Sequence, residues 1–121
     1  MAQHNELGKW GEDVAADFLV GKGFRIVERN WKVGRKEIDI IAMKDRLLLF
    51  VEVKTRGTNA FGDPYEAVDW KKRNTLITAM RQYIGINRVA SDVRFDSLSV
   101  VGSPESYSVQ WLEDAVSGYA R

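Results

Sequence analysis

The sequence predicts an α/β fold, with a mixed central sheet of about five strands flanked by helices in the order αβββαββ. Two observations predict this fold. Five segments have the apolar and β-branched composition of strands, while two others carry apolar residues at the three- and four-residue steps of amphipathic helices. The second helical segment falls between the third and fourth strand segments, so the chain must cross over there. Such a crossover predicts a mixed sheet with helices on both faces.

The first helix is expected from about Asn5 to Lys22, with Gly23 placed to cap its end. A basic turn, Val33-Gly34-Arg35, separates the first two strands, and Lys44-Asp45-Arg46 separates the second and third, which should therefore form a hairpin. The strands themselves are expected at residues 24–31, 37–43, 47–54, 93–101 and 108–112.

The second helix is expected to begin at Asp63-Pro64-Tyr65-Glu66 and to run to about Ile84. Asp63 would be the N-cap, Pro64 the first helical residue, and Glu66 the acid of a capping box. Lys72 falls within the apolar stripe of this helix, which consists of Tyr65, Val68, Leu76, Ala79 and Tyr83. Two interpretations of Lys72 stay open: it extends past the core to water, or it points toward a bound phosphate or an acidic cleft.

Composition limits the possible functions of this chain. Its 121 residues, 45% of them hydrophobic, suit a single domain over residues 1–121. The absence of cysteine excludes disulfides and thiolate zinc sites. The single histidine, His4, excludes a multi-histidine metal site, and its place near the N-terminus argues against a Ser-His-Asp triad. No signal peptide or apolar run of membrane-spanning length is visible, so we expect a cytoplasmic protein without a membrane partner.

Charge is distributed unevenly along the chain. Residues 22–81 carry 14 Lys/Arg and 8 Asp/Glu, whereas the rest carries 4 and 9. A basic middle suits a surface that binds a polyanion, because lysines and arginines near phosphates release condensed counterions. An ordinary mixed surface explains the same numbers.

The hairpin brings together the residues that are most informative about chemistry. If Asp45-Arg46 is a two-residue turn, Lys44 pairs with Leu47, Asp39 lies opposite Glu52, and Glu37 lies opposite Lys54. One face would then carry the apolar residues Ile41, Met43, Leu48 and Phe50 near the turn and these charged residues at the end away from the turn. The other face would be wholly apolar, consisting of Ile38, Ile40, Ala42, Leu47, Leu49, Val51 and Val53.

Two opposed carboxylates repel each other unless a cation lies between them. Mg²⁺ takes oxygen ligands, and Asp39, Glu52 and the backbone carbonyl of Val53 could supply them. Lys54 would lie beside this site, where it could orient or deprotonate a water molecule that attacks a phosphate. The alternative is an amphipathic hairpin with surface charges and a Glu37–Lys54 ion pair, and a one-residue change of register would separate the two acids.

The first helix offers a further acid. Gly8, Gly11 and Ala15 are small residues that would permit close approach of this helix to the sheet. Glu12, on the flank of the helix, could then reach toward the sheet instead of open solvent.

Taken together, these segments resemble the YraN-like proteins, a family grouped by sequence with restriction-endonuclease-like and Holliday-junction-resolvase-like nucleases. The resemblance covers Gly8 to about Asp96. It includes Gly11-Glu12, Asn30-Trp31, Glu37-Ile38-Asp39-Ile40-Ile41-Ala42, Phe50-Val51-Glu52-Val53-Lys54-Thr55-Arg56, Phe61-Gly62, Glu66-Ala67-Val68, Lys72 and Arg94-Phe95-Asp96. Two positions depart from the family pattern: Ile38 replaces the proline of the motif name, and Lys36 replaces a common glycine.

The resemblance implies a restriction-endonuclease-like fold and a PD-(D/E)xK active site. Asp39 and Glu52 match its two metal-binding acids, Lys54 its lysine, and Glu12 the helical acid of the resolvase branch. The expected cofactor is Mg²⁺, with Mn²⁺ as a substitute. The expected partner is nucleic acid, most naturally DNA, and a homodimer is compatible with the resemblance.

Three functions are compatible with the sequence. The first is a metal-dependent endonuclease acting on DNA, in particular on branched structures. The second is a nucleic-acid-binding module that does not cut, and the third is a partner-binding domain with a vestigial site. The residues expected to contact nucleic acid or to support the site are Glu37, Arg56, Lys72, Lys36, Arg35 and Arg29, with Arg25, Lys32 and Arg73 as further candidate phosphate contacts.

Overall fold

The computed structural model describes residues 2–57 and 70–115, and these form helices and strands in the predicted order αβββαββ. The elements are α1 (Ala2–Gly21), β1 (Arg25–Val33), β2 (Lys36–Lys44), β3 (Leu47–Arg56), α2 (Trp70–Ile86), β4 (Asp92–Ser103) and β5 (Ser106–Leu112). The predicted start of the second helix at Asp63 lies outside the described residues, as do Tyr65 and Val68 of its stripe.

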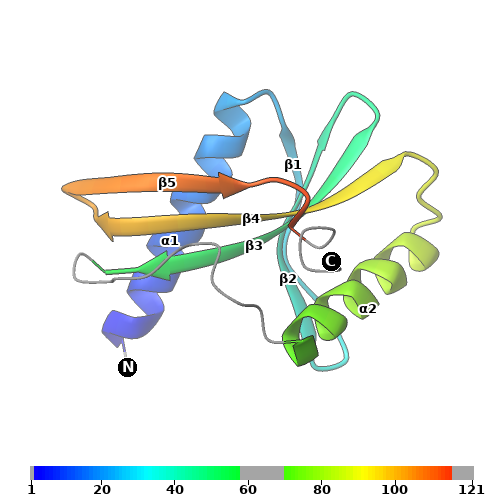
Figure 1. Cartoon of the computed structure of the whole chain (residues 1–121), viewed down its shortest axis with the longest axis horizontal. Coiled ribbons are helices and arrows are strands. Elements are labelled where there is room, and N and C mark those ends of the chain that lie inside the picture. The colour runs from blue at the N-terminus through cyan, green and yellow to red at the C-terminus, as the bar shows by residue number, and fades with distance from the viewer. Residues whose placement is uncertain (1, 58–69, 116–121) are drawn as a thin grey trace.

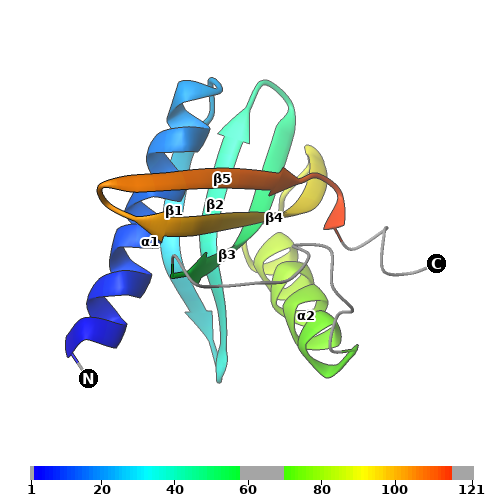
Figure 2. The same cartoon turned by 60° about the vertical axis from the view of Figure 1, so that its left-hand side comes forward.

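The five strands form one mixed sheet in the order β1-β2-β3-β4-β5. Neighbouring strands are antiparallel except β3 and β4, which run parallel because the chain crosses over through α2 between them. Figure 2 shows α1 on one side of the sheet and α2 on the other. The predicted mixed sheet with a helix on each face is therefore confirmed, and Figure 1 shows how strongly the sheet twists from β2 to β5.

Each helix covers its own apolar core. On the α1 side, Leu19 packs with Ile40 and Leu49, and on the α2 side, Tyr83 packs with Phe50. The α2 residues Leu76, Ala79 and Tyr83 all belong to the second core, as the apolar stripe predicts. The sheet is thus buried on both faces along its middle.

The end and the middle of α1 both depend on glycine. Gly23 has a φ of 96°, and the N–H groups of Gly23 and Phe24 donate to the carbonyls of Val20 and Leu19, both at 3.0 Å. This is a Schellman motif, which confirms the predicted cap. Gly11 is buried against β3, where a methyl group would overlap the Thr55 side chain. Gly11 therefore lets α1 approach the sheet closely, whereas Gly8 faces open space.

The β2–β3 hairpin has the predicted register over its first half. Lys44 pairs with Leu47, and the ladder continues as far as Ile40 and Val51. Beyond this point β2 pairs only with β1 and β3 only with β4, so the two strands diverge within the sheet. The predicted opposition of Asp39 to Glu52 is therefore wrong, and so is that of Glu37 to Lys54, because the ladder ends one residue before Asp39.

The side-chain alternation of β2 also changes where the strands diverge. Ile40 packs in the α1 core, but Ile38 packs in the α2 core, although residues two apart in a regular strand share a face. The neighbouring strand β1 contains Asn30 with a φ of 52°, which interrupts its own alternation. The prediction that Ile38 shares the face of Ile40 is thus wrong. Asp39 lies on the α1 side as a result.

On β4, where Asp96 pairs with Val51 of β3, the fully buried carboxylate of Asp96 joins β4 to β5 and to the turn that follows. It accepts two hydrogen bonds from Arg94, both at 2.8 Å, one from Trp111 Nε1 at 2.7 Å and one from the Asp114 N–H at 2.8 Å. A buried carboxylate is stable only when its oxygens are satisfied in this way. Asp96 therefore has a structural role, and the turn that it holds brings Ala115 into the α2 core.

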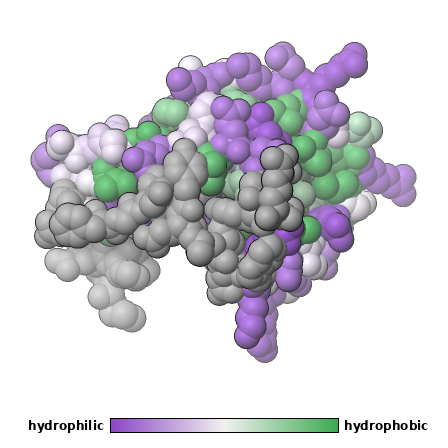
Figure 3. All heavy atoms as spheres, viewed as in Figure 1, coloured by the Kyte–Doolittle hydropathy of each residue, from purple (hydrophilic) through white to green (hydrophobic). Residues whose placement is uncertain are grey.

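The visible surface in Figure 3 is mainly hydrophilic, with hydrophobic residues reaching it at the end where α2 leads into β4. The exposed apolar side chains of this region are Ile86 and Val93. Neither helix in the described part of the chain carries an apolar stretch long enough to cross a bilayer.

We predict that Asp96→Asn lowers the free energy of unfolding by about 3–5 kcal/mol, because it leaves Arg94 and Trp111 facing an amide that cannot satisfy them. Trp111→Phe removes one hydrogen bond and should cost about 1–3 kcal/mol. Urea denaturation followed by circular dichroism measures both values.

Glu113→Gln is the control for this prediction, because Glu113 pairs with the same Arg94 at 3.2 Å but is 58% exposed. Its loss should cost no more than about 1 kcal/mol. Equal destabilisation by Asp96→Asn and Glu113→Gln would show that burial of the Asp96 network is not what stabilises this part of the sheet.

Candidate metal centre between strands β2 and β3

Asp39 lies at the position where β2 and β3 diverge. Its carboxylate accepts a hydrogen bond of 2.8 Å from the backbone N–H of Val53. In a continued β2–β3 pairing this N–H would donate to a backbone carbonyl of β2, and here the Asp39 side chain takes the place of that carbonyl. The side chain is partly buried. The divergence therefore fixes a carboxylate inside the sheet instead of on its rim.

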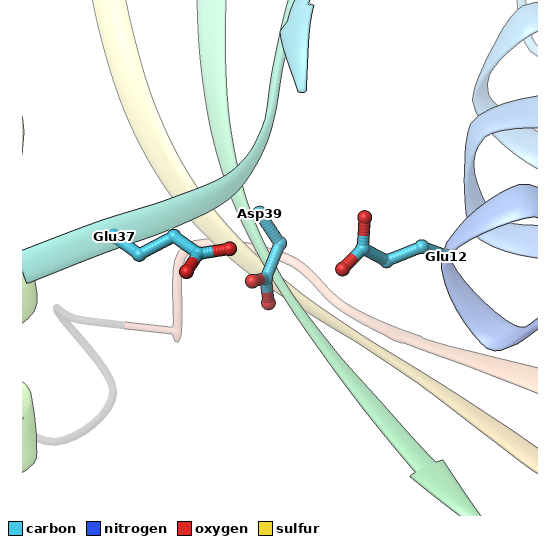
Figure 4. Close-up of side chains that lie close together, drawn as sticks. All are labelled: Glu12, Glu37 and Asp39. Carbon is cyan, nitrogen blue, oxygen red and sulfur yellow. The ribbon is translucent and has the colours of Figure 1, made fainter. Parts of the chain in front are cut away.

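Two further acids converge on Asp39 from the α1 side. Glu12 comes from α1 and Glu37 from β2, and one carboxylate oxygen from each of the three acids lies within 4.8 Å of the others. Figure 4 shows the three carboxylates pointing toward a common centre. Glu12 thus reaches the sheet, as its place on the helix flank predicts, and the close approach of α1 at Gly11 makes this reach possible.

Asn30 holds two of these acids in place. Its side-chain amide donates to both oxygens of Glu12, each at 3.0 Å, and to Glu37 at 2.9 Å. The left-handed conformation of Asn30, which asparagine tolerates better than most residues, accompanies this placement on the α1 side of β1. No role for Asn30 is predicted from the sequence beyond its place in the family motif, although an asparagine inside a charged strand can signal a special backbone conformation.

Arg29, predicted to contact nucleic acid, is ion-paired in the structure. Its guanidinium lies 2.8 Å from Asp13 and 3.5 Å from Glu12. Asp13 was not predicted to contribute, because its position on α1 relative to β1 depends on the packing of the helix. Arg29 therefore offsets part of the negative charge beside Glu12.

A cavity of about 220 Å³ opens next to the acids, lined by Leu7, Gly8, Glu12, Asp39, Val53 and Thr55. Two of the three converging acids, Glu12 and Asp39, line it. The missing side chain of Gly8 leaves room in its wall. The acids are thus accessible from one side of the molecule.

Glu52 lies on the other side of the sheet. Its carboxylate is 2.8 Å from the ammonium of Lys72 on α2, and only 12% of its side chain is exposed. The prediction that Asp39 and Glu52 point to the same face is therefore wrong, because the alternation of β2 changes at Asp39 while that of β3 does not. The gap between the strands nevertheless keeps Glu52 close enough to influence Asp39 electrostatically.

The remaining predicted residues lie along the same strands. Lys54 follows Glu52 by two residues in an unbroken ladder with β4, so it shares the α2 side with Glu52. Arg56 ends β3, Lys36 begins β2, and Arg35 lies in the exposed turn between β1 and β2.

Burial raises the pKa of Asp39 from 3.8 to about 6, and it is the largest cause of the shift. The hydrogen bond from Val53 opposes the rise, whereas the negative charges of Glu12, Glu37 and Glu52 add to it. The negative charges of the other three acids therefore disfavour ionised Asp39, and a cation bound beside it would offset them.

Comparison with known proteins gives a consistent family match. The profile of the "Uncharacterised protein family UPF0102" matches residues 11–100. UPF0102 proteins of Flavobacterium psychrophilum and Phocaeicola vulgatus are each 42% identical over 115 residues, which cover 95% of this chain and 97% and 95% of the relatives. A UPF0102 protein of Flavobacterium johnsoniae is 43% identical over 119 residues, covering 95% of this chain and 97% of the relative.

We predict that Asp39 makes the metal-free protein less stable as the pH rises from about 4 to about 6. In this window the folded state retains a proton that the unfolded state has lost, so raising the pH favours unfolding. The full loss corresponds to about 3 kcal/mol. Asp39→Asn keeps an acceptor for the Val53 N–H and should therefore exceed wild type in stability by about this amount at pH 7–8, but not near pH 4.

Urea denaturation in EDTA across this pH range measures the difference between the two proteins. Asp17→Asn, at an exposed acid of α1, controls for the removal of one negative charge. A stability difference between Asp39→Asn and wild type that stays constant from pH 4 to pH 8 would contradict the raised pKa.

Proposed function

The chain belongs to the UPF0102 family, the YraN-like family that its motifs resemble, and we propose that it is a metal-dependent endonuclease that hydrolyses phosphodiester bonds in DNA. The observation that carries this proposal is the convergence of three carboxylates, one of them that of the partly buried Asp39, beside an open cavity. The family's link by sequence to restriction-endonuclease-like nucleases supports the same chemistry.

The donor set fits Mg²⁺ or Mn²⁺. Glu12, Glu37 and Asp39 offer only carboxylate oxygens, which are the hard ligands that these cations prefer, and the chain has no cysteine for a thiolate site. Burial and the neighbouring acids raise the pKa of Asp39, so a bound cation would favour its ionised form. Asp39 and Glu12 would hold the cation, with Glu52 and the backbone carbonyl of Val53 as the further ligands expected from the sequence.

When bound, a divalent cation at these carboxylates would polarise the phosphate and lower the pKa of a nearby water molecule. Asp39 is suited to fix its position, because the Val53 N–H already orients the carboxylate. Asn30 keeps Glu12 and Glu37 directed at the same centre. Lys54, on the side of the sheet that Glu52 occupies, would orient or deprotonate the attacking water, or neutralise charge that develops on the phosphate.

Basic residues at the open ends of the strands are suited to hold the DNA backbone. Lys32 and Arg35 are exposed near the β1–β2 turn, and Lys36 and Arg56 are partly exposed at the ends of β2 and β3. Contacts of this kind position a duplex without reading its sequence. Discrimination among linear and branched DNAs would then arise from shape, which is how we propose that the enzyme selects branched substrates.

A second candidate function is a nucleic-acid-binding module that does not cut. It is favoured by the ion pair between Glu52 and Lys72, since an acid that is already neutralised has less need of a metal. The two proposals make different demands on the acids: cleavage requires them, whereas binding through lysines and arginines does not.

Cleavage of a DNA panel tests the proposed function. The panel contains linear duplex, single-stranded, flapped and four-way-junction DNA, each incubated with Mg²⁺ or Mn²⁺. We expect metal-dependent cutting by wild type, a loss of at least about 100-fold in Asp39→Asn and Glu52→Gln, and a loss of about 10²–10⁴-fold in Lys54→Met. Asp17→Asn should cut like wild type.

Circular dichroism of each variant confirms that folding is retained. Salt-sensitive binding with no cutting of any substrate would replace the nuclease with the binding module. Cutting that survives both Asp39→Asn and Glu52→Gln would assign the activity to another site or to a contaminant.

A further inference from the structure

Lys72 is the described residue that neutralises Glu52 most directly. Its ammonium lies 2.8 Å from Glu52 Oε2, and the two side chains differ sharply in exposure, with 12% for Glu52 and 57% for Lys72. The acid is therefore held in the sheet while the lysine reaches it from solvent along the surface of α2. A lysine has a flexible four-carbon stem, so its ammonium can leave without any movement of the backbone.

Glu52 is not one of the three converging acids Glu12, Glu37 and Asp39, and it lies on the α2 side of the sheet with Lys72. Its negative charge acts on Asp39 across the gap between β2 and β3, together with those of Glu12 and Glu37. On the α1 side, Asn30 and Arg29 of β1 contact Glu12. On the α2 side, the charge of Glu52 is offset by a group that can move away.

We infer that Lys72 and a divalent cation compete for the Glu52 carboxylate, so that the arrival of the cation releases the Lys72 ammonium to bind a phosphate of the substrate. This inference rests on the proposed function, because it assigns the cation to the acids around Asp39. Without the cation, Lys72 neutralises Glu52. In the metal-loaded protein the same lysine lies beside the site as an unpaired positive charge.

The exposure of Lys72 favours replacement of its ammonium at Glu52 by a cation over a permanent Lys72–Glu52 ion pair. Ion pairs with one solvent-exposed partner are weak, and a lysine ammonium binds a carboxylate as a point charge without the two-point geometry of arginine. A divalent cation carries twice the charge and accepts several oxygen ligands at once. The Lys72–Glu52 ion pair thus neutralises Glu52 in the absence of metal, and a divalent cation can displace Lys72 from it.

Calorimetric titration with Mn²⁺ and with Mg²⁺ tests the competition directly. We expect Lys72→Met to tighten metal binding, with a Kd lower by roughly 3- to 10-fold, the range of a modest ion pair. Lys71→Met is the matched control, because it removes the same charge from the adjacent exposed position of α2. It should change the Kd by less than about twofold, because a solvent-exposed charge outside the contact is screened.

A double-mutant cycle then identifies Glu52 as the shared group. In a Glu52→Gln background, Lys72→Met should no longer tighten metal binding, because the carboxylate for which the two cations compete has gone. An equal effect of Lys72→Met in both backgrounds, or an effect no larger than that of Lys71→Met, would overturn the inference.

The NMR signal of the Lys72 side chain gives a second readout that does not depend on activity. On saturation with Mg²⁺, its ε-methylene resonances should move to the positions they have in Glu52→Gln. Resonances that stay at their metal-free positions at saturation would show that Lys72 keeps its contact with Glu52, which excludes exchange.

These measurements also separate the inference from the proposed function. If wild type binds the cations but Lys72→Met binds them no more tightly, the metal site stands and the competition is wrong. If neither protein binds Mg²⁺ or Mn²⁺, the proposed function fails, and the inference fails with it.

Discussion

The hydrogen bond between the Val53 N–H and the Asp39 carboxylate marks the place where β2 and β3 stop pairing, and the rest of the candidate site depends on this change. If β2 and β3 had continued to pair, no gap would separate them, and the Asp39 side chain would lie on one face of the sheet. Because the strands diverge, a carboxylate enters the sheet and burial raises its pKa. Acids from both sides of the sheet can then act on one position.

The two helices contribute to this position in different ways. Helix α1 approaches closely at Gly11 and delivers Glu12, which Asn30 ties to Glu37. Helix α2 delivers a cation, Lys72, to Glu52 on the other side. The buried Asp96 network, which joins β4 to β5, has its own set of donors: Arg94, Trp111 and the Asp114 N–H.

Local sequence patterns predict much of this arrangement. The hairpin register follows from a two-residue turn at Asp45-Arg46, and the end of α1 follows from Gly23, since both depend on neighbouring residues alone. The strand divergence and the change of face at Asp39 are not predictable in this way, because a period-two pattern assumes an unbroken strand. Asn30 and Asp13 escaped prediction because their partners lie on other elements.

If the strand divergence at Asp39 creates a divalent-cation site, a crystal grown with Mn²⁺ will hold the ion there. Anomalous scattering locates the ion without reference to activity. We expect a peak within about 2.0–2.4 Å of an Asp39 carboxylate oxygen, with Glu12 or Glu52 as a further ligand. Ordered Asp39, Glu12 and Glu52 carboxylates with no anomalous peak among them, at a saturating Mn²⁺ concentration, would contradict the proposal of a divalent-cation site.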